Sequence, residues 1–248
     1  MGAQILVRCF ELAGASHVAA DRLMQVMNSP KTPVSPLRIL QTQLGLIVEQ
    51  LEKIEEYDAQ RPPDITYVFH QHAERVARNI EKTCIHMGLG KIVARNMYWA
   101  LLPHDIGKRL LPVHLWDQEE KPDDAMKKLR RTHTELGVKL VDDVFDDILH
   151  PFKTLMTDIM LNHHEQMDGG GYRGLSGDKL SRPVRLAAII EAFDGWSIRR
   201  PHFGKRDTSI PGVLTRIRDE KSGFFDMELF EAFAAMKMEE YKNVEGMN

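Results

Sequence analysis

Cysteine is scarce in this sequence of 248 residues, which holds only Cys9 and Cys84 and no CxxC pair. Two separated thiols cannot build a disulfide framework or a cysteine-rich zinc site, and they fit a reducing compartment. Long hydrophobic runs are also missing, since no apolar stretch approaches the roughly 20 residues of a transmembrane helix. The first ten residues carry Arg8 inside a short apolar run and lack the plan of a signal peptide. We therefore expect a cytoplasmic protein that does not cross a membrane.

A strong net charge is missing as well. The 33 Lys and Arg residues nearly balance the 36 Asp and Glu residues, for a formal charge of −3. Such a balance gives no overall attraction to DNA, RNA or anionic lipid, so we expect neither a nucleic-acid polymer nor a membrane as a partner. The length fits one large domain, or a medium domain with a small appendage.

No stretch shows the extended alternation of an exposed β-strand, so the sequence predicts an all-α fold. Apolar residues instead recur at three- and four-residue spacing, most clearly from Leu40 to Ile54, which predicts a helix over residues 37–57. Asp64 is placed as the N-cap of a second helix. Further helices are expected over residues 92–102, 123–144, 152–164, 182–194, 210–221 and 227–241. Residues 1–60 are assigned to a small N-terminal helical segment, with helices over 2–28 and a proline-rich elbow, and residues 61–248 to the main domain.

Two short motifs carry the polar residues that stand out. The first is His104-Asp105-Ile106-Gly107-Lys108, and the second runs from Asn162 through His163-His164 to Tyr172. Imidazole together with carboxylate suits zinc, iron, manganese, nickel or cobalt ions. Structural metal sites in small domains usually use thiolates, which both motifs lack. We therefore expect a catalytic site with open coordination positions.

The helical pattern turns further histidines and carboxylates inward. Taken singly, an inward histidine is more often a hydrogen-bonded core residue than a metal ligand. Five separate helices or helix ends each carry such a group, however, and each unsatisfied group would cost about 1–3 kcal/mol. A shared metal centre is the cheaper explanation for the set, which comprises His72, His104-Asp105, His133, His163-His164 and Glu191. Gly137, one turn after His133, would let another backbone come close.

These residues resemble the HD-GYP family, a branch of the HD-domain metal-dependent phosphohydrolases. The resemblance covers roughly residues 64–215 and has five elements in order. They are HAERVA from His72, HDIGK at 104–108, HTELG from His133, NHHEQMDGGGYRGLSG at 162–177 and EAFDGWSIRRP at 191–201.

The resemblance implies an HD-domain helical bundle that hydrolyses cyclic di-GMP, a bacterial second messenger, to linear pGpG or GMP with a metal-bridged hydroxide. Asp105 would bridge two divalent ions, with iron or manganese favoured and zinc, nickel, cobalt and magnesium compatible. The implied metal ligands are His72, His104, Asp105, His133, His163, His164 and Glu191. The implied substrate contacts are Lys108, Tyr172, Arg173 and Arg200, with Lys108 and Asp105 as the catalytic pair. A homodimer or a diguanylate cyclase domain is an expected protein partner.

Four positions depart from the family pattern. Arg173 replaces the proline of GYP, so that the loop would be less rigid and would gain a cation for a phosphate. Glu191 stands where the family usually has Asp. Val68 stands where members with three metals often carry Glu, so we expect two metals. Phe203 stands where a basic residue is expected. These departures leave two alternatives open: an inactive cyclic-dinucleotide receptor or interaction module, and a phosphohydrolase for another nucleotide.

Overall fold

The computed structural model describes residues 36–118, 120–145, 151–200 and 204–245. These residues form helices and no β-strand, with one isolated antiparallel bridge between Asp168 and Ser176, so the all-α prediction is confirmed for them. The predicted helices over residues 2–28 lie outside the described part. The α-helices are α3 (Pro36–Asp58), α4 (Phe69–His86), α5 (Lys91–Leu101), α6 (Asp124–Arg131), α7 (His133–Phe145), α8 (Pro151–Asn162), α9 (Arg182–Ser197), α10 (Ile210–Glu220) and α11 (Met227–Glu245). Short 3-10 turns are η1 (Ile106–Leu110), η2 (Val113–Leu115), η3 (Gly177–Lys179) and η5 (Ser222–Phe224).

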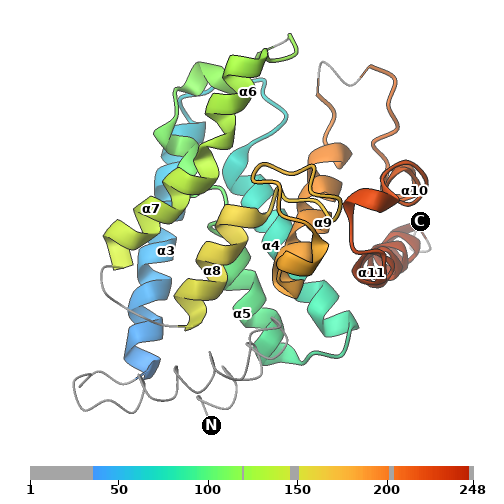
Figure 1. Ribbon diagram of the computed structural model, residues 1–248, viewed down its shortest axis with the longest axis horizontal. Coiled ribbons are helices and arrows are strands. Elements are labelled where there is room, and N and C mark those ends of the chain that lie inside the picture. Colours follow the sequence, from blue (N-terminus) through green and yellow to red (C-terminus); the bar gives the residue numbers. More distant parts are fainter. Residues whose placement is uncertain (1–35, 119, 146–150, 201–203, 246–248) are drawn as a thin grey trace.

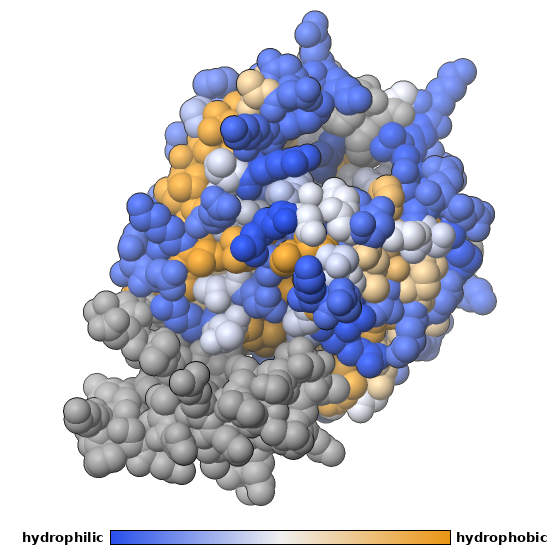
Figure 2. Space-filling view, viewed as in Figure 1, coloured by the Kyte–Doolittle hydropathy of each residue, from blue (hydrophilic) through white to orange (hydrophobic). Residues whose placement is uncertain are grey.

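Helix α4 lies at the centre of the bundle and packs against α3, α5, α9 and α11, while α7 packs against η1 and α8 (Figure 1). The main buried apolar cluster takes residues from α3 through α11, including Ile47, Val76, Met160, Ile190 and Phe230. Each such side chain contributes about 1.5–3 kcal/mol when it leaves water. On the face seen in Figure 2, hydrophilic residues predominate and apolar ones form separate small patches. Among the described helices, none has the length and apolarity needed to span a membrane.

The described part of the N-terminal segment is α3, which packs against α4 and η1. Ile47 of α3 belongs to the main buried cluster, and Ile54 and Tyr57 pack with Phe69 of α4. The boundary at residue 60 stays a prediction, but α3 shares its buried face with the helices that follow. The last turn of α3 therefore stands beside the start of α4.

The predicted N-cap at Asp64 is wrong, because α4 begins at Phe69 after Val68 in extended conformation. The first amides of a helix have no partner within the helix and need an acceptor. Here the acceptor is Asp58 at the end of α3, whose carboxylate accepts from the backbone N–H of Phe69 (3.1 Å) and of His70 (2.8 Å). The cap of α4 is thus supplied by the preceding helix. Local capping patterns span only a few residues, so they could not identify it.

The predicted helix over 123–144 is two helices, because the chain breaks at Thr132 between α6 and α7. Asp123 caps α6, accepting from the backbone N–H of Met126. Leu129 near the end of α6 is 42% exposed, whereas His133 is buried as the first residue of α7. The break therefore changes the direction of the helix just before a predicted metal ligand.

Two glycines let η1 lie directly against α7. A Cβ at Gly107 would be 2.0 Å from the carbonyl oxygen of His133 and 2.5 Å from the backbone nitrogen of Gly137, so no larger residue fits there. The close approach expected at Gly137 is confirmed. It brings the chain around Asp105 next to the start of α7.

Candidate metal centre

The structure brings all seven predicted metal ligands together at the centre of the bundle. His72 comes from α4, His133 from the first turn of α7, and Glu191 from α9. His104-Asp105 follows the end of α5, and His163-His164 follows the end of α8. The ligand atoms form two groups, and in each group they lie within 4.8 Å of one another. The groups are Asp105, His133, His163 and His164, and His72, His104, Asp105 and Glu191. Asp105 belongs to both.

The two carboxylate oxygens of Asp105 face different groups. Oδ1 lies 3.1 Å from Nε2 of His133 and 3.7 Å from Nε2 of His163. Oδ2 lies 3.5 Å from Nε2 of His72 and 3.4 Å from Nε2 of His104. A carboxylate with one oxygen in each group has the arrangement of a bridging ligand. Within the second group, Oε2 of Glu191 is 2.9 Å from His72 Nε2 and 3.2 Å from His104 Nε2.

The hydrogen bonds of the imidazoles fix which nitrogen is free for an ion. Nδ1 donates to the carbonyl of Leu101 in His104 (2.8 Å), of Arg130 in His133 (2.6 Å) and of Met160 in His163 (2.9 Å). A carbonyl only accepts, so each Nδ1 carries a proton, and Nε2 is the nitrogen that offers a lone pair to an ion whenever the ring is neutral. That is the tautomer a metal ligand needs.

Several buried polar atoms in this cluster lack a hydrogen-bond partner within the described part of the chain. They are Asp105 Oδ1, His133 Nε2, His163 Nε2 and Glu191 Oε2. Buried polar groups are nearly always satisfied in native proteins, and exceptions call for an explanation such as an ion. The imidazole and carboxylate donors of both groups fit divalent transition-metal ions.

The opposite charges of the buried histidines and carboxylates shift one another's pKa values. Burial lowers the pKa of His72 and His104, but the carboxylates of Glu191 and Asp105 outweigh it and raise the two values to about 10 and about 9. Burial alone would raise the pKa of Glu191, but those cationic rings hold it well below its ordinary value. In the other group, burial keeps the pKa of His164 well below normal. Metal binding at the group that contains His72 and His104 would therefore release protons.

An outer pair of residues orients His72. Asp194 Oδ2 accepts from His72 Nδ1 at 2.7 Å, and its carboxylate also accepts from Arg75 Nε (2.7 Å) and Nη2 (3.0 Å). Such outer contacts set the ring orientation and basicity of a ligand. Sequence reasoning quoted Asp194 and Arg75 only as parts of motifs and gave neither a role. The available signal was position, since each lies three residues, or one helical turn, after a ligand.

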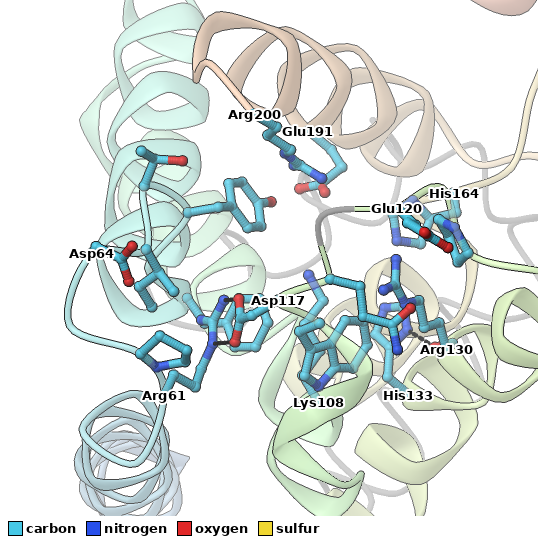
Figure 3. A pocket seen from close by; sticks show the side chains of 18 of the residues that line it. Arg61, Asp64, Lys108, Asp117, Glu120, Arg130, His133, His164, Glu191 and Arg200 are labelled. Atoms are coloured by element: carbon cyan, nitrogen blue, oxygen red, sulfur yellow. Dashed lines mark hydrogen bonds and ion pairs between the residues drawn. The ribbon is translucent and has the colours of Figure 1, made fainter. Parts of the chain in front are cut away.

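A cavity of about 480 Å³ opens over the centre (Figure 3). Three ligands line it, namely His133, His164 and Glu191, together with the predicted substrate contacts Lys108, Tyr172 and Arg200. Its wall also carries Tyr67, Trp116 and Arg130, which sequence reasoning did not select. A second cavity, of about 380 Å³, reaches His163, His164 and Glu191 from the side of Trp196. The centre is thus accessible to a ligand larger than water.

Lys108 is a buried cation beside the shared ligand. Its ammonium donates to Asp105 Oδ2. It also lies over three aromatic rings, at 4.7 Å from the centroid of Phe69, 5.5 Å from Tyr67 and 5.6 Å from Trp116. Attraction to the ring faces stabilises a desolvated ammonium. The charge of Lys108 is therefore held at the cavity floor.

The loop after α8 holds Tyr172 over the centre and turns Arg173 away from it. The ring of Tyr172 lies 4.4 Å from that of His164. Arg173 donates from Nη1 to Asn162 Oδ1 (2.8 Å), and its backbone N–H donates to the buried Glu165. Arg173 is not among the residues that line either cavity, so its expected phosphate contact has no geometric support here. The arginine instead ties the loop to the end of α8.

Comparison with known proteins gives one family. A sequence model of the HD domain family matches residues 64–229. A 3'3'-cGAMP-specific phosphodiesterase of Vibrio cholerae is 27% identical over 174 residues, which cover 69% of this chain and 38% of that protein. A cyclic di-GMP phosphodiesterase of Thermotoga maritima is 26% identical over 171 residues, covering 68% of this chain and 45% of that protein. The chain therefore spans less than half the length of these curated relatives.

Solved structures agree with the fold. A protein of Bdellovibrio bacteriovorus described as an HDG"Y"P protein, Bd1817, matches with a TM-score of 0.58 at 13% identity, over 90% of this chain and 79% of that one. The HD domain of the phosphodiesterase PgpH of L. monocytogenes matches with a TM-score of 0.50 at 16% identity, over 79% of this chain and 98% of that one. At these identities the likeness concerns the helical fold.

Proposed function

Because this chain belongs to the HD domain family, we propose that it is a metal-dependent phosphodiesterase that hydrolyses a cyclic dinucleotide, with cyclic di-GMP as the first candidate. The observation that carries the proposal is the pair of candidate ligand groups that share Asp105 and reach an open cavity through His133, His164 and Glu191. We further assign the chain to the HD-GYP branch from its motifs, with GYR in place of GYP.

The cofactor we propose is a pair of divalent ions, iron or manganese first, held by the seven residues named above. Two such ions would supply a water of strongly lowered pKa as the nucleophile and would neutralise charge on the phosphate. Asp105 supports this reading because its two oxygens face different groups. The unpartnered atoms of His133, His163 and Glu191 support it as well.

The residues of the chain would bind and orient the substrate. Lys108 places a buried positive charge beside Asp105, where negative charge develops as the phosphodiester is attacked. Arg200 adds a second cation to the cavity wall, with its guanidinium 4.0 Å from the centroid of Tyr67. Tyr172 lies in the loop that the hydrogen bond from Arg173 to Asn162 ties to the end of α8, and it would border the reacting phosphate. A protein nucleophile is not needed in this scheme.

The substrate class rests on the relatives, whose names specify cyclic di-GMP in one case and 3'3'-cGAMP in another. Both are cyclic dinucleotides with two phosphodiester groups and at least one guanine. We therefore rank cyclic di-GMP first and the mixed guanine–adenine dinucleotide second.

Metal analysis of anaerobically purified protein, followed by turnover of both dinucleotides in the same sample, tests the proposal. We expect about two divalent ions per chain, appearance of a linear dinucleotide, and no turnover by His104→Ala or Asp105→Ala. Full turnover by both variants would remove the site assignment. Stoichiometric binding without hydrolysis, with any of the divalent metals, would favour a receptor instead.

A further inference from the structure

The cationic side chains on the wall of the cavity differ in whether they form an ion pair with a carboxylate. Arg61 forms a bidentate ion pair with Asp117 through Nε (2.8 Å) and Nη2 (2.6 Å), and Lys108 pairs with Asp105. Arg130 lines the same cavity but forms no ion pair with a carboxylate of the described residues. Its charge is therefore available to a ligand.

The guanidinium of Arg130 is held in place by uncharged groups. Nη2 donates to the backbone carbonyl of Leu115, and the guanidinium carbon lies 5.6 Å from the ring centroid of Trp116. Its Nε is buried and has no hydrogen-bond partner in the described chain. Burial, and then the nearby charge of Arg200, lower the pKa of Arg130. A buried donor without an acceptor is costly, so an anion in the cavity would stabilise this arrangement.

The anion must be compatible with the rest of the site. The wall of the cavity also carries Arg200, so that two guanidinium groups approach one space. A guanidinium presents a planar set of donors that matches two oxygens of a phosphate. A cyclic dinucleotide has two phosphodiester groups, and only one of them can lie at the metal centre while it is cleaved. The other keeps its negative charge and needs a partner inside the cavity.

We propose that Arg130 binds the phosphodiester group that is not being cleaved, and thereby selects a substrate with two phosphates. This inference rests on the proposed function, since it takes a cyclic dinucleotide as the substrate. Arg130 is a specificity residue in this account, because it contacts the substrate away from the reacting atoms.

The position of Arg130 ties substrate recognition to the metal centre. Its backbone carbonyl accepts from Nδ1 of His133 at 2.6 Å, so one residue orients a ligand with its main chain and faces the cavity with its side chain. The hydrogen bond to Leu115 and the ring of Trp116 hold the guanidinium before the substrate arrives. Such preorganisation lowers the entropy lost on binding.

Two substrates with different numbers of phosphates test the inference. Cyclic di-GMP has two phosphodiesters, and bis(p-nitrophenyl) phosphate has one. In Arg130→Gln we expect KM for cyclic di-GMP to rise about 10- to 100-fold, which is the effect of losing a charge-assisted hydrogen bond. The kcat for cyclic di-GMP and kcat/KM for bis(p-nitrophenyl) phosphate should stay within about twofold. Glutamine keeps a polar side chain without the charge, and Arg130→Lys should show an intermediate KM because it keeps the charge without the planar fork.

Lys128→Gln is the matched control, because it removes one positive charge from the same helix at an exposed position outside the cavity. It should leave both substrates unaffected. An equal loss on both substrates in Arg130→Gln, or an unchanged KM for cyclic di-GMP, would overturn the inference while the proposed function stands. Wild-type protein that cleaves bis(p-nitrophenyl) phosphate but neither cyclic dinucleotide would overturn the proposed function, and this inference with it.

Discussion

Asp58, Arg61, His70 and Asp117 form a polar cluster, the Asp58 cluster, in which Asp58 and Arg61 are buried and His70 and Asp117 are partly exposed. It differs from the candidate metal centre in how its polar atoms are satisfied. Oδ1 of Asp58 accepts from Arg61 (2.6 Å) and from the backbone of Phe69, while Oδ2 accepts from the backbone and ring of His70 (2.8 and 2.9 Å). Arg61 uses its remaining donors on Asp117. In the candidate metal centre, by contrast, four buried atoms have no hydrogen-bond partner among the described residues, namely Asp105 Oδ1, His133 Nε2, His163 Nε2 and Glu191 Oε2.

The difference separates a structural cluster from a binding site. Both regions contain buried charged side chains, so burial of charge alone would mark both as functional. The hydrogen bonds of the Asp58 cluster satisfy it without a ligand, and they join the end of α3 to the start of α4 and to the loop after η2. The unpartnered atoms of the candidate metal centre would be satisfied by ions, as we propose. Substitutions should therefore damage the two regions in different ways.

Replacing the shared ligand should have the largest effect. In Asp105→Asn, one substitution weakens both ligand groups, so we expect metal content to fall well below that of the wild type. We expect each ion to contribute at least as much to the rate as one preorganised hydrogen-bond donor, which is about 10²- to 10³-fold. Weakening both ion sites should therefore lower the activity about 10⁴-fold or more. Metal analysis and turnover of cyclic di-GMP measure the two effects. Asp143→Asn, an exposed change of the same kind on α7, is the control. Retention of both ions by Asp105→Asn would contradict the bridging assignment.

Breaking the complete cluster should instead cost stability. Asp58→Asn leaves the buried Arg61 without one of its two carboxylates and offers an amide to backbone donors, so unfolding should become easier by about 3–5 kcal/mol. Urea titration in the presence of chelator measures this change. The metal content of the folded fraction should equal that of the wild type.

Asp64→Asn supplies the matched control for Asp58. Asp64 is exposed and is the residue that local sequence favours as the cap of α4. Its substitution should change the free energy of unfolding by less than about 0.5 kcal/mol. A larger loss in Asp64→Asn than in Asp58→Asn would show that the cap is local after all.

Arg75 forms an ion pair with Asp194, which in turn accepts a hydrogen bond from the proposed ligand His72. Its substitution tests whether such an outer contact affects metal affinity or stability alone. In Arg75→Ala we expect the affinity of the group containing His72 to fall by about 10- to 100-fold, the usual effect of an outer partner. Titration calorimetry of Mn²⁺ into metal-free protein measures it. Arg78→Ala, one turn further on and paired only with Glu74, should bind Mn²⁺ like the wild type. A loss of unfolding free energy in Arg75→Ala with unchanged Mn²⁺ affinity would assign the pair to structure alone.

The convergence of the seven proposed ligands was predictable because each of them belongs to a local pattern. His72 and Glu191 lie on helical stripes of apolar residues, and His104-Asp105 and His163-His164 are short motifs that follow helices. The inward direction of each could be read without knowing how the helices pack. Convergence on one centre followed from the cost of burying them separately, and the described fold brings them together.

The contacts that sequence missed join residues far apart in the chain or depend on a break in a helix. Asp58 caps α4 from eleven residues before Phe69, and periodicity carries no information about such a partner. Arg130 lines the cavity from the last turn of α6, just before the break at Thr132, where apolar spacing predicted a continuous helix. Arg173 was read by its charge as a phosphate contact, whereas Asn162 engages its guanidinium. In each case tertiary geometry outweighed the local pattern.

A surface ion pair should show the smallest effect. Glu240 of α11 accepts from Lys82 of α4 (2.5 Å) and from Lys237 (2.7 Å). Burial raises the pKa of Glu240, but the two lysines outweigh it and hold the value below 4.5. A carboxylate with a lowered folded pKa contributes stability above its unfolded pKa and loses it as pH falls through the folded value. Glu240→Gln should therefore cost up to about 1 kcal/mol of unfolding free energy at pH 7, and the difference from wild type should shrink below about pH 4.5.

Urea titrations between pH 3 and 7 measure this difference, with the substitution Glu239→Gln at a 67% exposed side chain as the control. A difference that grows on acidification would mean that the lysines do not lower the pKa of Glu240.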